Sequence, residues 1–253
     1  MALSLTIRVP RALLAVWLCS AVASMIGISF TGTAFAQTAR EVPIGQAAEA
    51  EEIAGEPTAI EPFELRLSGK RVHFLRAGPV DGFPVLLLHG ARFSAETWRD
   101  LGTIELLARQ GFQVWAMDLP GYGQSEASDA PAENFLASVL PLLSERPMVV
   151  VSPSMSGRFS LPLVIDRPGW VAGFVPVAPG GVQTYLPKLQ GSKVPTLIFW
   201  GENDAIVSPK DAEKMARAMP ASRKVVIPGA SHPCYLDSPF EFHRELLHFL
   251  NGL

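Results

Sequence analysis

Short apolar runs alternate with amphipathic segments along the chain from Phe63 onward. Two period-two segments, 63–67 and 71–76, predict a β-hairpin. The runs that predict buried strands are 85–88, 114–117, 148–151, 174–177, 196–200 and 224–227. The segments with helical spacing are 97–109, 134–143, 156–165, 209–218 and 239–250. Strands that alternate with helices predict an α/β fold, in which a mostly parallel sheet is covered by helices on both faces.

Polar residues gather just after the ends of five of these runs. They are His89–Arg92, Asp118–Ser125, Ser152–Ser156, Gly201–Asp204 and Gly229–His232. Ligands of open α/β sheets bind at the carboxyl ends of the strands. The order of a serine, an aspartate and a histidine, each after its own strand, is that of the α/β-hydrolase triad. The chain therefore predicts an α/β-hydrolase fold with Ser154, Asp204 and His232 as catalytic residues.

The nucleophile is predicted at the stretch from Met148 to Gly157, where a strand stops at small residues and a helix follows. The usual motif is G-x-S-x-G, and here serines replace both glycines. Ser152 is a poor nucleophile because the next residue, Pro153, has no N–H for an oxyanion hole. Ser156 would place Arg158 where the turn needs a small side chain. Ser154 fits best, with the N–H groups of Met155 and Ala91 stabilising the oxyanion.

Several other side chains have more than one interpretation. Glu202 is the rival to Asp204 as the acid of the triad, and we prefer Asp204. Arg92 is either a surface residue or a contact for an anionic or acyl group at the mouth of the site. We interpret His89 as a residue that orients its loop and Cys234 as a small packed residue. His73, His243 and His248 are interpreted as structural or surface residues, and we expect neither a metal nor a cofactor.

The amino-terminal residues divide into two segments before the hydrolase domain, which we place at 62–253. Residues 1–36 combine a basic start, an apolar run and the small-x-small ending Ala34–Ala36, which is typical of a cleaved signal peptide. The same run is nearly long enough for an uncleaved membrane anchor. Residues 37–61 form an acidic linker rich in Ala and Glu. We expect the protein to be exported, either periplasmic or secreted, or anchored at its amino terminus.

Composition excludes some partners. The chain is 48% hydrophobic and 18% charged, which suits one globular domain with a tail. Residues 62–253 carry 18 acidic and 18 basic side chains without a basic run, so we expect no nucleic-acid partner. A membrane partner is expected only if the amino-terminal segment stays uncleaved. After cleavage Cys234 is alone, so no internal disulfide is possible.

The segment between Val177 and Thr196 is too short for a large cap domain. A short helix or turn around Leu186 and Leu189 would fill it. An open, shallow site favours small acyl groups, or acyl groups displayed on a larger molecule.

Four stretches resemble the alpha/beta-hydrolase-domain-containing protein 14 family over about residues 65–253. They are Leu86–Trp98 (LLLHGARFSAETW), Ser152–Gly157 (SPSMSG), Gly173–Pro179 (GFVPVAP) and His232–Asp237 (HPCYLD). The resemblance implies a single-domain hydrolase with the central serine of the elbow as nucleophile. It also implies activity on p-nitrophenyl esters and, in one branch, transfer of acetyl from lysine to coenzyme A. Another branch carries an amino-terminal membrane anchor.

The leading hypothesis is therefore a serine hydrolase that cleaves short-chain acyl esters or amides through an acyl-enzyme. One alternative is an acyltransferase or deacetylase that passes the acyl group to coenzyme A. Coenzyme A is scarce outside the cytoplasm, so water is the more plausible acceptor for an exported enzyme. The other alternative is a non-catalytic binding protein on the same fold.

Overall fold

The computed structural model describes residues 59–253. The predicted signal segment 1–36 and nearly all of the linker 37–61 lie outside the described residues. One boundary needs correction, because Glu61, which we placed in the linker, is the first residue of strand β1 (Glu61–Leu67). Glu61 pairs with Arg76 in the ladder, and their side chains form an ion pair of 3.0 Å. The folded domain therefore begins before residue 62.

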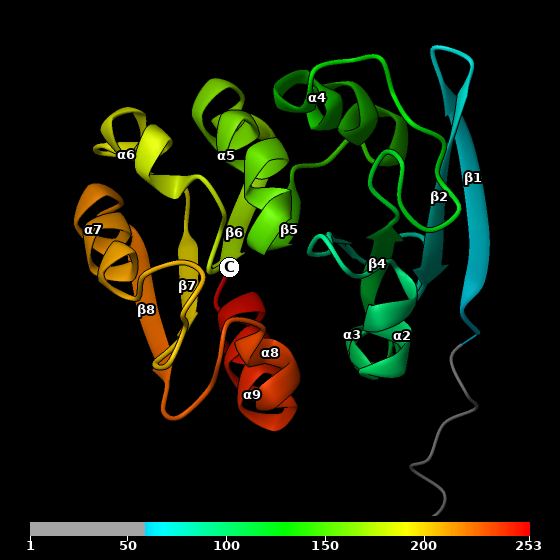
Figure 1. Ribbon diagram of the computed structural model, residues 1–253. Helices are drawn as coiled ribbons and strands as arrows, with labels where there is room; N and C mark the ends of the chain where they lie inside the picture. The colour runs from blue at the N-terminus through cyan, green and yellow to red at the C-terminus, as the bar shows by residue number, and fades with distance from the viewer. Residues whose placement is uncertain (1–58) are drawn as a thin grey trace, which may run out of the picture. The chain divides into compact units, whose positions relative to one another are not determined.

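Eight strands form one sheet in the order β1-β2-β4-β3-β5-β6-β7-β8 (Figure 1). The strands after β1 are β2 (Lys70–Ala77), β3 (Phe83–Leu87), β4 (Phe112–Met117), β5 (Met148–Pro153), β6 (Val171–Val177), β7 (Thr196–Gly201) and β8 (Ser222–Ile227). β1 pairs antiparallel with β2, and β2 pairs antiparallel with β4. Every other pairing is parallel, which confirms the predicted mostly parallel sheet.

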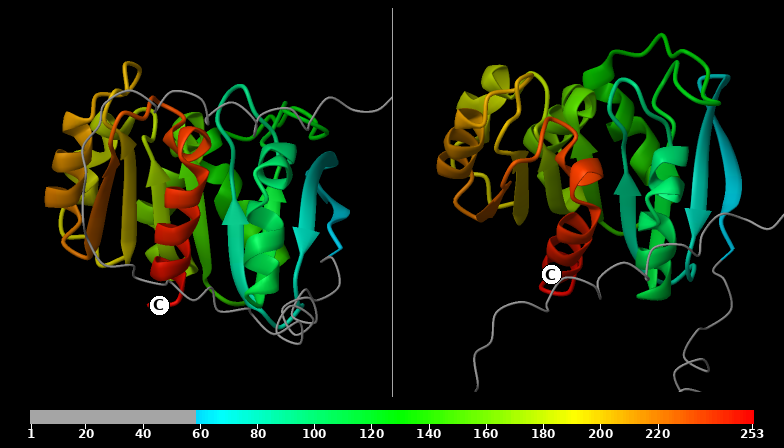
Figure 2. Two further views of the ribbon diagram at one scale, coloured as in Figure 1. Left: turned by 90° about the horizontal axis from the view of Figure 1, so that it is seen from below. Right: turned by 60° about the horizontal axis from the view of Figure 1, so that its bottom comes forward.

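Helices cover both faces of the sheet, and each face has its own core (Figures 1 and 2). One layer contains α4 (Ala132–Leu143), α5 (Gly157–Asp166), α6 (Val182–Leu189) and α7 (Lys210–Ala218). The other contains α2 (Glu96–Asp100), α3 (Thr103–Arg109), α8 (Cys234–Asp237) and α9 (Pro239–Leu250). Side chains alternate across the sheet, so Leu86 and Val150 enter the first core while Leu87 and Val151 enter the second. All four are fully buried, which explains why these strands are apolar at every position.

The single helix that we predicted over 97–109 is wrong, because the chain forms α2 and α3 there. Gly102 separates them with a φ of +74°, a conformation that ends a helix and that glycine adopts without steric cost. Trp98 from α2 and Leu107 from α3 enter the same core, so the apolar periodicity continues across the break. Two short elements, η2 (Pro168–Trp170) and α8, were not predicted.

The crossover from β6 to β7 contains α6 and no cap domain. This confirms the expectation drawn from the length of that segment. Within residues 59–253, no helix has both the length and the apolar character that crossing a membrane requires.

Candidate active site

The turn between β5 and α5 presents Ser154 at its apex. β5 ends at Pro153, a short 3-10 turn η1 covers Ser154–Ser156, and α5 begins at Gly157. Ser154 has a φ of +50°, in the left-handed region that costs a non-glycine residue about 1–3 kcal/mol. The carbonyl of Ser154 accepts a hydrogen bond of 2.7 Å from the Gly180 N–H, which helps to hold this conformation. The strand, sharp turn and helix form the local geometry of a nucleophile elbow.

The two serines that replace the glycines of the motif are completely buried beneath this turn. The Ser152 hydroxyl lies 2.9 Å from the Ser156 hydroxyl and 2.6 Å from that of Ser160. Ser156 also donates to the Pro153 carbonyl at 2.8 Å. These three hydroxyls, the buried serine chain, satisfy one another, so the extra oxygen atoms need no water.

Gly157, the first residue of α5, is closely packed in the elbow, and the sequence motif did not predict this close contact. A Cβ at Gly157 would lie 2.9 Å from both the Gly180 carbonyl oxygen and the Pro179 side chain. The contribution of Ser160 was also missed, although it lies at helical spacing from Ser156 on the buried face of α5.

The structure brings Ser154, His232 and Asp204 into one line of hydrogen bonds. The Ser154 hydroxyl lies 2.7 Å from Nε2 of His232, and Nδ1 of His232 lies 2.7 Å from Oδ2 of Asp204. The Asp204 side chain is fully buried, whereas 13% of the His232 side chain is exposed. Oδ1 of Asp204 accepts N–H bonds of 2.8 Å from Ile206 and 2.9 Å from Val207. The carboxylate is thus fixed, and the imidazole lies within hydrogen-bond reach of the serine hydroxyl.

Glu202, the rival acid, contacts a different part of the site. Its Oε2 accepts the Gly229 N–H at 2.8 Å, so it holds the start of the loop that carries His232. Asp237 holds the same loop from the other side, where it accepts both the N–H and the hydroxyl of Ser231. Neither carboxylate is the partner of the imidazole in the described structure.

The loop after β3 lies next to Ser154. A Cβ at Gly90 would lie 3.7 Å from Cβ of Ser154, which is ordinary van der Waals contact. Ala91 comes next, and its N–H has no hydrogen-bond acceptor among the described residues. Met155 directly follows Ser154 in the sequence. The assignment of the Ala91 and Met155 N–H groups to an oxyanion hole stays a prediction.

Comparison with known proteins places this geometry in a family. Residues 85–182 match the model of the alpha/beta hydrolase family, and residues 181–239 match the alpha/beta hydrolase fold. Human ABHD14B, which is named as a candidate protein-lysine deacylase, is 42% identical over 200 residues, covering 75% of this chain and 94% of that protein. The chain belongs to the ABHD14 family of α/β-hydrolases. ABHD14A from Danio rerio is 39% identical over 194 residues, covering 71% of this chain and 72% of that protein.

Solved structures share the fold of this chain. A CIB-like hydrolase from Thermoplasma acidophilum has a TM-score of 0.73 at 25% identity, with 78% of this chain and all of that chain covered. Carboxylesterase CesB from Bacillus subtilis shares the fold with a TM-score of 0.70 at 18% identity, covering 82% and 97%. The family models and the curated relatives together make this protein an enzyme of the α/β-hydrolase class.

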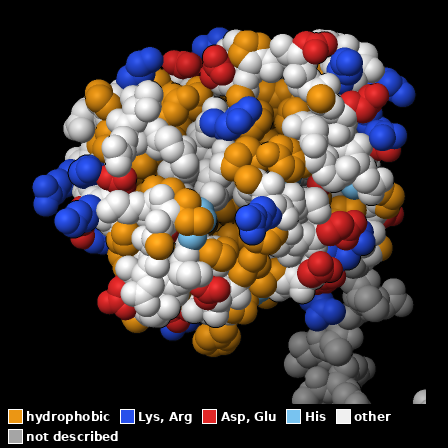
Figure 3. All heavy atoms as spheres, in the orientation of Figure 1, with side chains coloured by type: hydrophobic (Ala, Val, Ile, Leu, Met, Phe, Trp, Pro, Cys, Tyr) orange, Lys and Arg blue, Asp and Glu red, His pale blue; other side chains and the backbone are white. Residues whose placement is uncertain are grey.

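The remaining candidate residues of this ABHD14 family member surround the site or support it. Arg92 is exposed and forms neither a hydrogen bond nor an ion pair within residues 59–253. Cys234 is fully buried, and burial raises the pKa of its thiol to about 12, in keeping with a packed residue. His243 lies 2.8 Å from the Thr103 hydroxyl, which joins α9 to α3. On the face shown in Figure 3, histidine atoms lie in a hollow bordered by hydrophobic side chains.

Proposed function

We propose that this protein is a serine hydrolase that cleaves short-chain acyl esters or amides through an acyl-enzyme. The observation that carries the proposal is the continuous line from Asp204 through His232 to Ser154, with 2.7 Å at each step. The strained backbone of Ser154 supports it further, because strain of this kind is found where a nucleophile must project from its turn.

The reaction follows from the donors and acceptors on the line. His232 takes the proton of Ser154 as the oxygen attacks the acyl carbon, and the electron pair of the carbonyl bond moves to oxygen. Asp204 fixes the tautomer of His232 and stabilises the imidazolium. The N–H groups of Ala91 and Met155 stabilise the oxyanion, at about 3 kcal/mol per donor. His232 then returns the proton to the leaving group, and water repeats the sequence on the acyl-serine.

The short β6–β7 crossover supports a small acyl group as substrate. α6 is the one helix of that crossover, which adds no cap domain to the described residues. Arg92 is proposed to contact the substrate at the mouth of the site, because its exposed guanidinium lacks a protein partner in the described part of the chain.

A second acceptor deserves a direct test, because relatives about 40% identical are named as candidate protein-lysine deacylases. In this alternative the acyl group of a modified lysine passes to Ser154 and then to coenzyme A. Turnover of an acetyl-lysine peptide that rises with added coenzyme A would support it. Equal turnover with and without coenzyme A would exclude it.

Export is a separate proposal that rests on residues 1–36 alone. Sequencing the amino terminus of the purified protein tests it. A first residue at Gln37 would support cleavage, and an intact start would support the anchored alternative.

The central test is labelling with a fluorophosphonate probe, which reacts only with an activated serine. We expect wild-type protein to be labelled and to hydrolyse p-nitrophenyl acetate. Ser154→Ala should abolish both, while Ser156→Ala, which alters a buried neighbour, should keep the label. An unlabelled but folded wild-type protein would contradict the proposal and favour a binding role.

A further inference from the structure

The peptide bond between Gly90 and Ala91 is oriented by two hydrogen bonds to its carbonyl group. The Gly90 oxygen accepts the Nδ1–H of His89 at 2.8 Å and the N–H of Phe93 at 3.1 Å. A trans peptide is planar, so its C=O and N–H point in opposite directions. Fixing the carbonyl of Gly90 therefore fixes the direction of the Ala91 N–H, the donor proposed for the oxyanion.

His89 is itself held in one orientation. It is completely buried, and its Nε2 accepts the N–H of Leu119 at 2.9 Å. The Tyr122 ring packs edge-on against the imidazole, with 5.3 Å between the two ring centroids. Burial lowers the pKa of His89, which favours the neutral imidazole with one donor and one acceptor nitrogen. Both nitrogens have matching partners, so the ring links the oxyanion loop, residues 89–95, to the neighbouring loop, residues 118–125.

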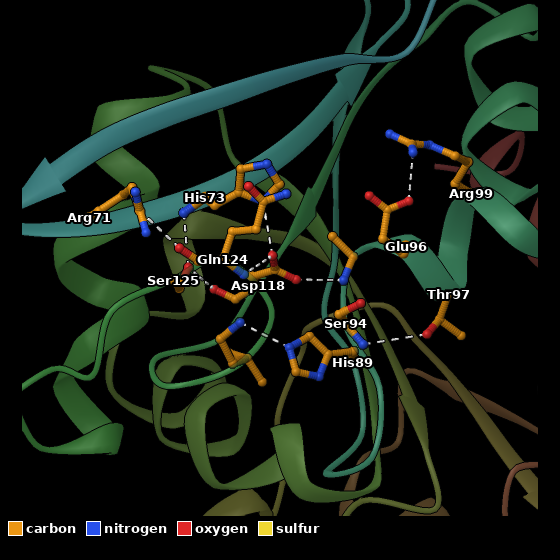
Figure 4. A network of polar contacts seen from close by, with 12 residues as sticks. Arg71, His73, His89, Ser94, Glu96, Thr97, Arg99, Asp118, Gln124 and Ser125 are labelled. Carbon is orange, nitrogen blue, oxygen red and sulfur yellow. Dashed lines mark hydrogen bonds and ion pairs between the residues drawn. The ribbon is translucent and has the colours of Figure 1, made fainter.

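Asp118 makes the second link between the same two loops (Figure 4). Its Oδ1 accepts the N–H of Ala95 at 2.7 Å, at the far end of the oxyanion loop. Its Oδ2 accepts the Gln124 N–H and the Nδ1–H of His73, each at 2.9 Å. The residue is 2% exposed, and such a buried carboxylate is stable only with donors of this kind.

Two features make Asp118 a rigid anchor. A Cβ at Gly123 would lie 2.2 Å from the Asp118 carboxylate, so the backbone of the second loop wraps closely around it. His73 belongs to β2, and its own N–H donates to the Ser125 hydroxyl at 2.9 Å. The oxyanion loop is thereby tied to the sheet through Asp118.

We propose that His89 and Asp118 are positioning residues for the oxyanion hole. His89 sets the direction of the Ala91 N–H, and Asp118 sets the place of the loop that carries it. The inference rests on the proposed function of Ser154 and assigns the loop contacts to one step, stabilisation of the tetrahedral oxyanion.

Substitutions separate the donor from the volume of the ring. His89→Phe keeps the ring size and removes the Nδ1–H, whereas His89→Asn keeps an amide N–H near the position of Nδ1. Asp118→Asn keeps one oxygen for Ala95 but leaves an N–H facing Gln124. We expect His89→Phe and Asp118→Asn to lower kcat for p-nitrophenyl acetate by about 10- to 100-fold, with KM within about twofold. His89→Asn should recover most of the loss.

A trifluoromethyl ketone supplies a readout that a merely structural role would not change. Ser154 adds to its carbonyl carbon, the electron pair moves to oxygen, and the proton goes to His232, so the adduct carries the oxyanion. If the two residues position the hole, affinity for the ketone should fall by the same factor as kcat/KM across the variants. Asp211→Asn is the matched control, because Asp211 is equally buried but lies on α7 and bonds to Lys214 and Gln183.

The outcomes separate the two proposals. Wild-type protein that neither turns over the ester nor binds the ketone would contradict the proposed function. Active wild-type protein with unchanged ketone affinity in His89→Phe and Asp118→Asn would overturn the positioning roles. If His89→Phe fails to fold, the kcat/KM and the ketone affinity of Asp118→Asn and His89→Asn decide the question. Asp211→Asn then controls for an effect of lost stability alone.

Discussion

Asp204 and Glu202 lie two residues apart on one loop and act on different atoms of the site. Asp204 contacts the imidazole of His232, whereas Glu202 contacts the backbone at Gly229. From the sequence alone both residues were candidates for the acid of the triad, because both follow the same strand. Only the fold shows that the Glu202 side chain turns to the neighbouring loop.

The pair supports a prediction at the scale of single residues. We expect Asp204→Asn to lower kcat about 10⁴-fold, because an amide N–H facing Nδ1 stabilises the wrong imidazole tautomer. Glu202→Gln should change kcat less than about tenfold, since its amide oxygen can still accept the Gly229 N–H. Steady-state kinetics on p-nitrophenyl acetate measures both. A larger loss in Glu202→Gln than in Asp204→Asn would reverse the assignment.

Residue-level prediction succeeded where backbone chemistry left one answer and stopped where partners are distant in sequence. Pro153 excluded Ser152 because it lacks an N–H, and the structure indeed leaves Ser154 as the serine beside His232. The contacts of Asp118 with His73 and Ala95 span 45 and 23 residues. No spacing rule predicts such long-range pairs.

At the scale of elements, the buried serine chain under the elbow makes hydrogen bonds that the usual G-x-S-x-G motif lacks, because glycine has no hydroxyl. Each hydroxyl of Ser152, Ser156 and Ser160 is satisfied by another member. Removing one member leaves the hydroxyls of its neighbours with fewer partners in a buried site, whereas removing all three leaves no hydroxyl of the group without a partner. The stability of the elbow therefore depends on the chain as a unit.

This coupling is measurable by urea unfolding. Ser152→Ala should lower the free energy of unfolding by about 1–3 kcal/mol, because it removes the central member. The triple variant with Ala at all three positions should cost clearly less than the sum of the three single changes. Labelling of Ser154 by the fluorophosphonate should persist in each variant, as a control for the site. Strictly additive losses would show that the hydroxyls act independently.

Element prediction worked wherever one apolar period coincided with one element. The terminal helix was predicted over 239–250, the range that α9 occupies. The segment 97–109 misled because α2 and α3 present Trp98 and Leu107 to one core on either side of Gly102. Periodicity reports which face is buried, and it does not report a break that preserves that face.

At the scale of the whole molecule, alternation of strands and helices predicted the class of fold, and it did not predict the strand order. β4 lies between β2 and β3, so the chain must pass β3 on its way from β4 to β5. Apolar strands such as β3 and β5 look alike, and nothing in their composition specifies their neighbours. The site was nevertheless predictable, because every parallel strand delivers its following loop to the same edge.

The short β6–β7 crossover has a consequence for the products of the enzyme. In the proposed acyl-enzyme, an acyl group that no cap domain of this crossover covers would meet dissolved nucleophiles in proportion to their abundance. In mixtures of methanol and water we expect the ratio of methyl ester to free acid to rise linearly with methanol. Gas chromatography of the products from a p-nitrophenyl ester measures this partition. A ratio that saturates at low methanol would instead reveal a bound acceptor. A linear ratio would show that the surrounding medium selects which product forms.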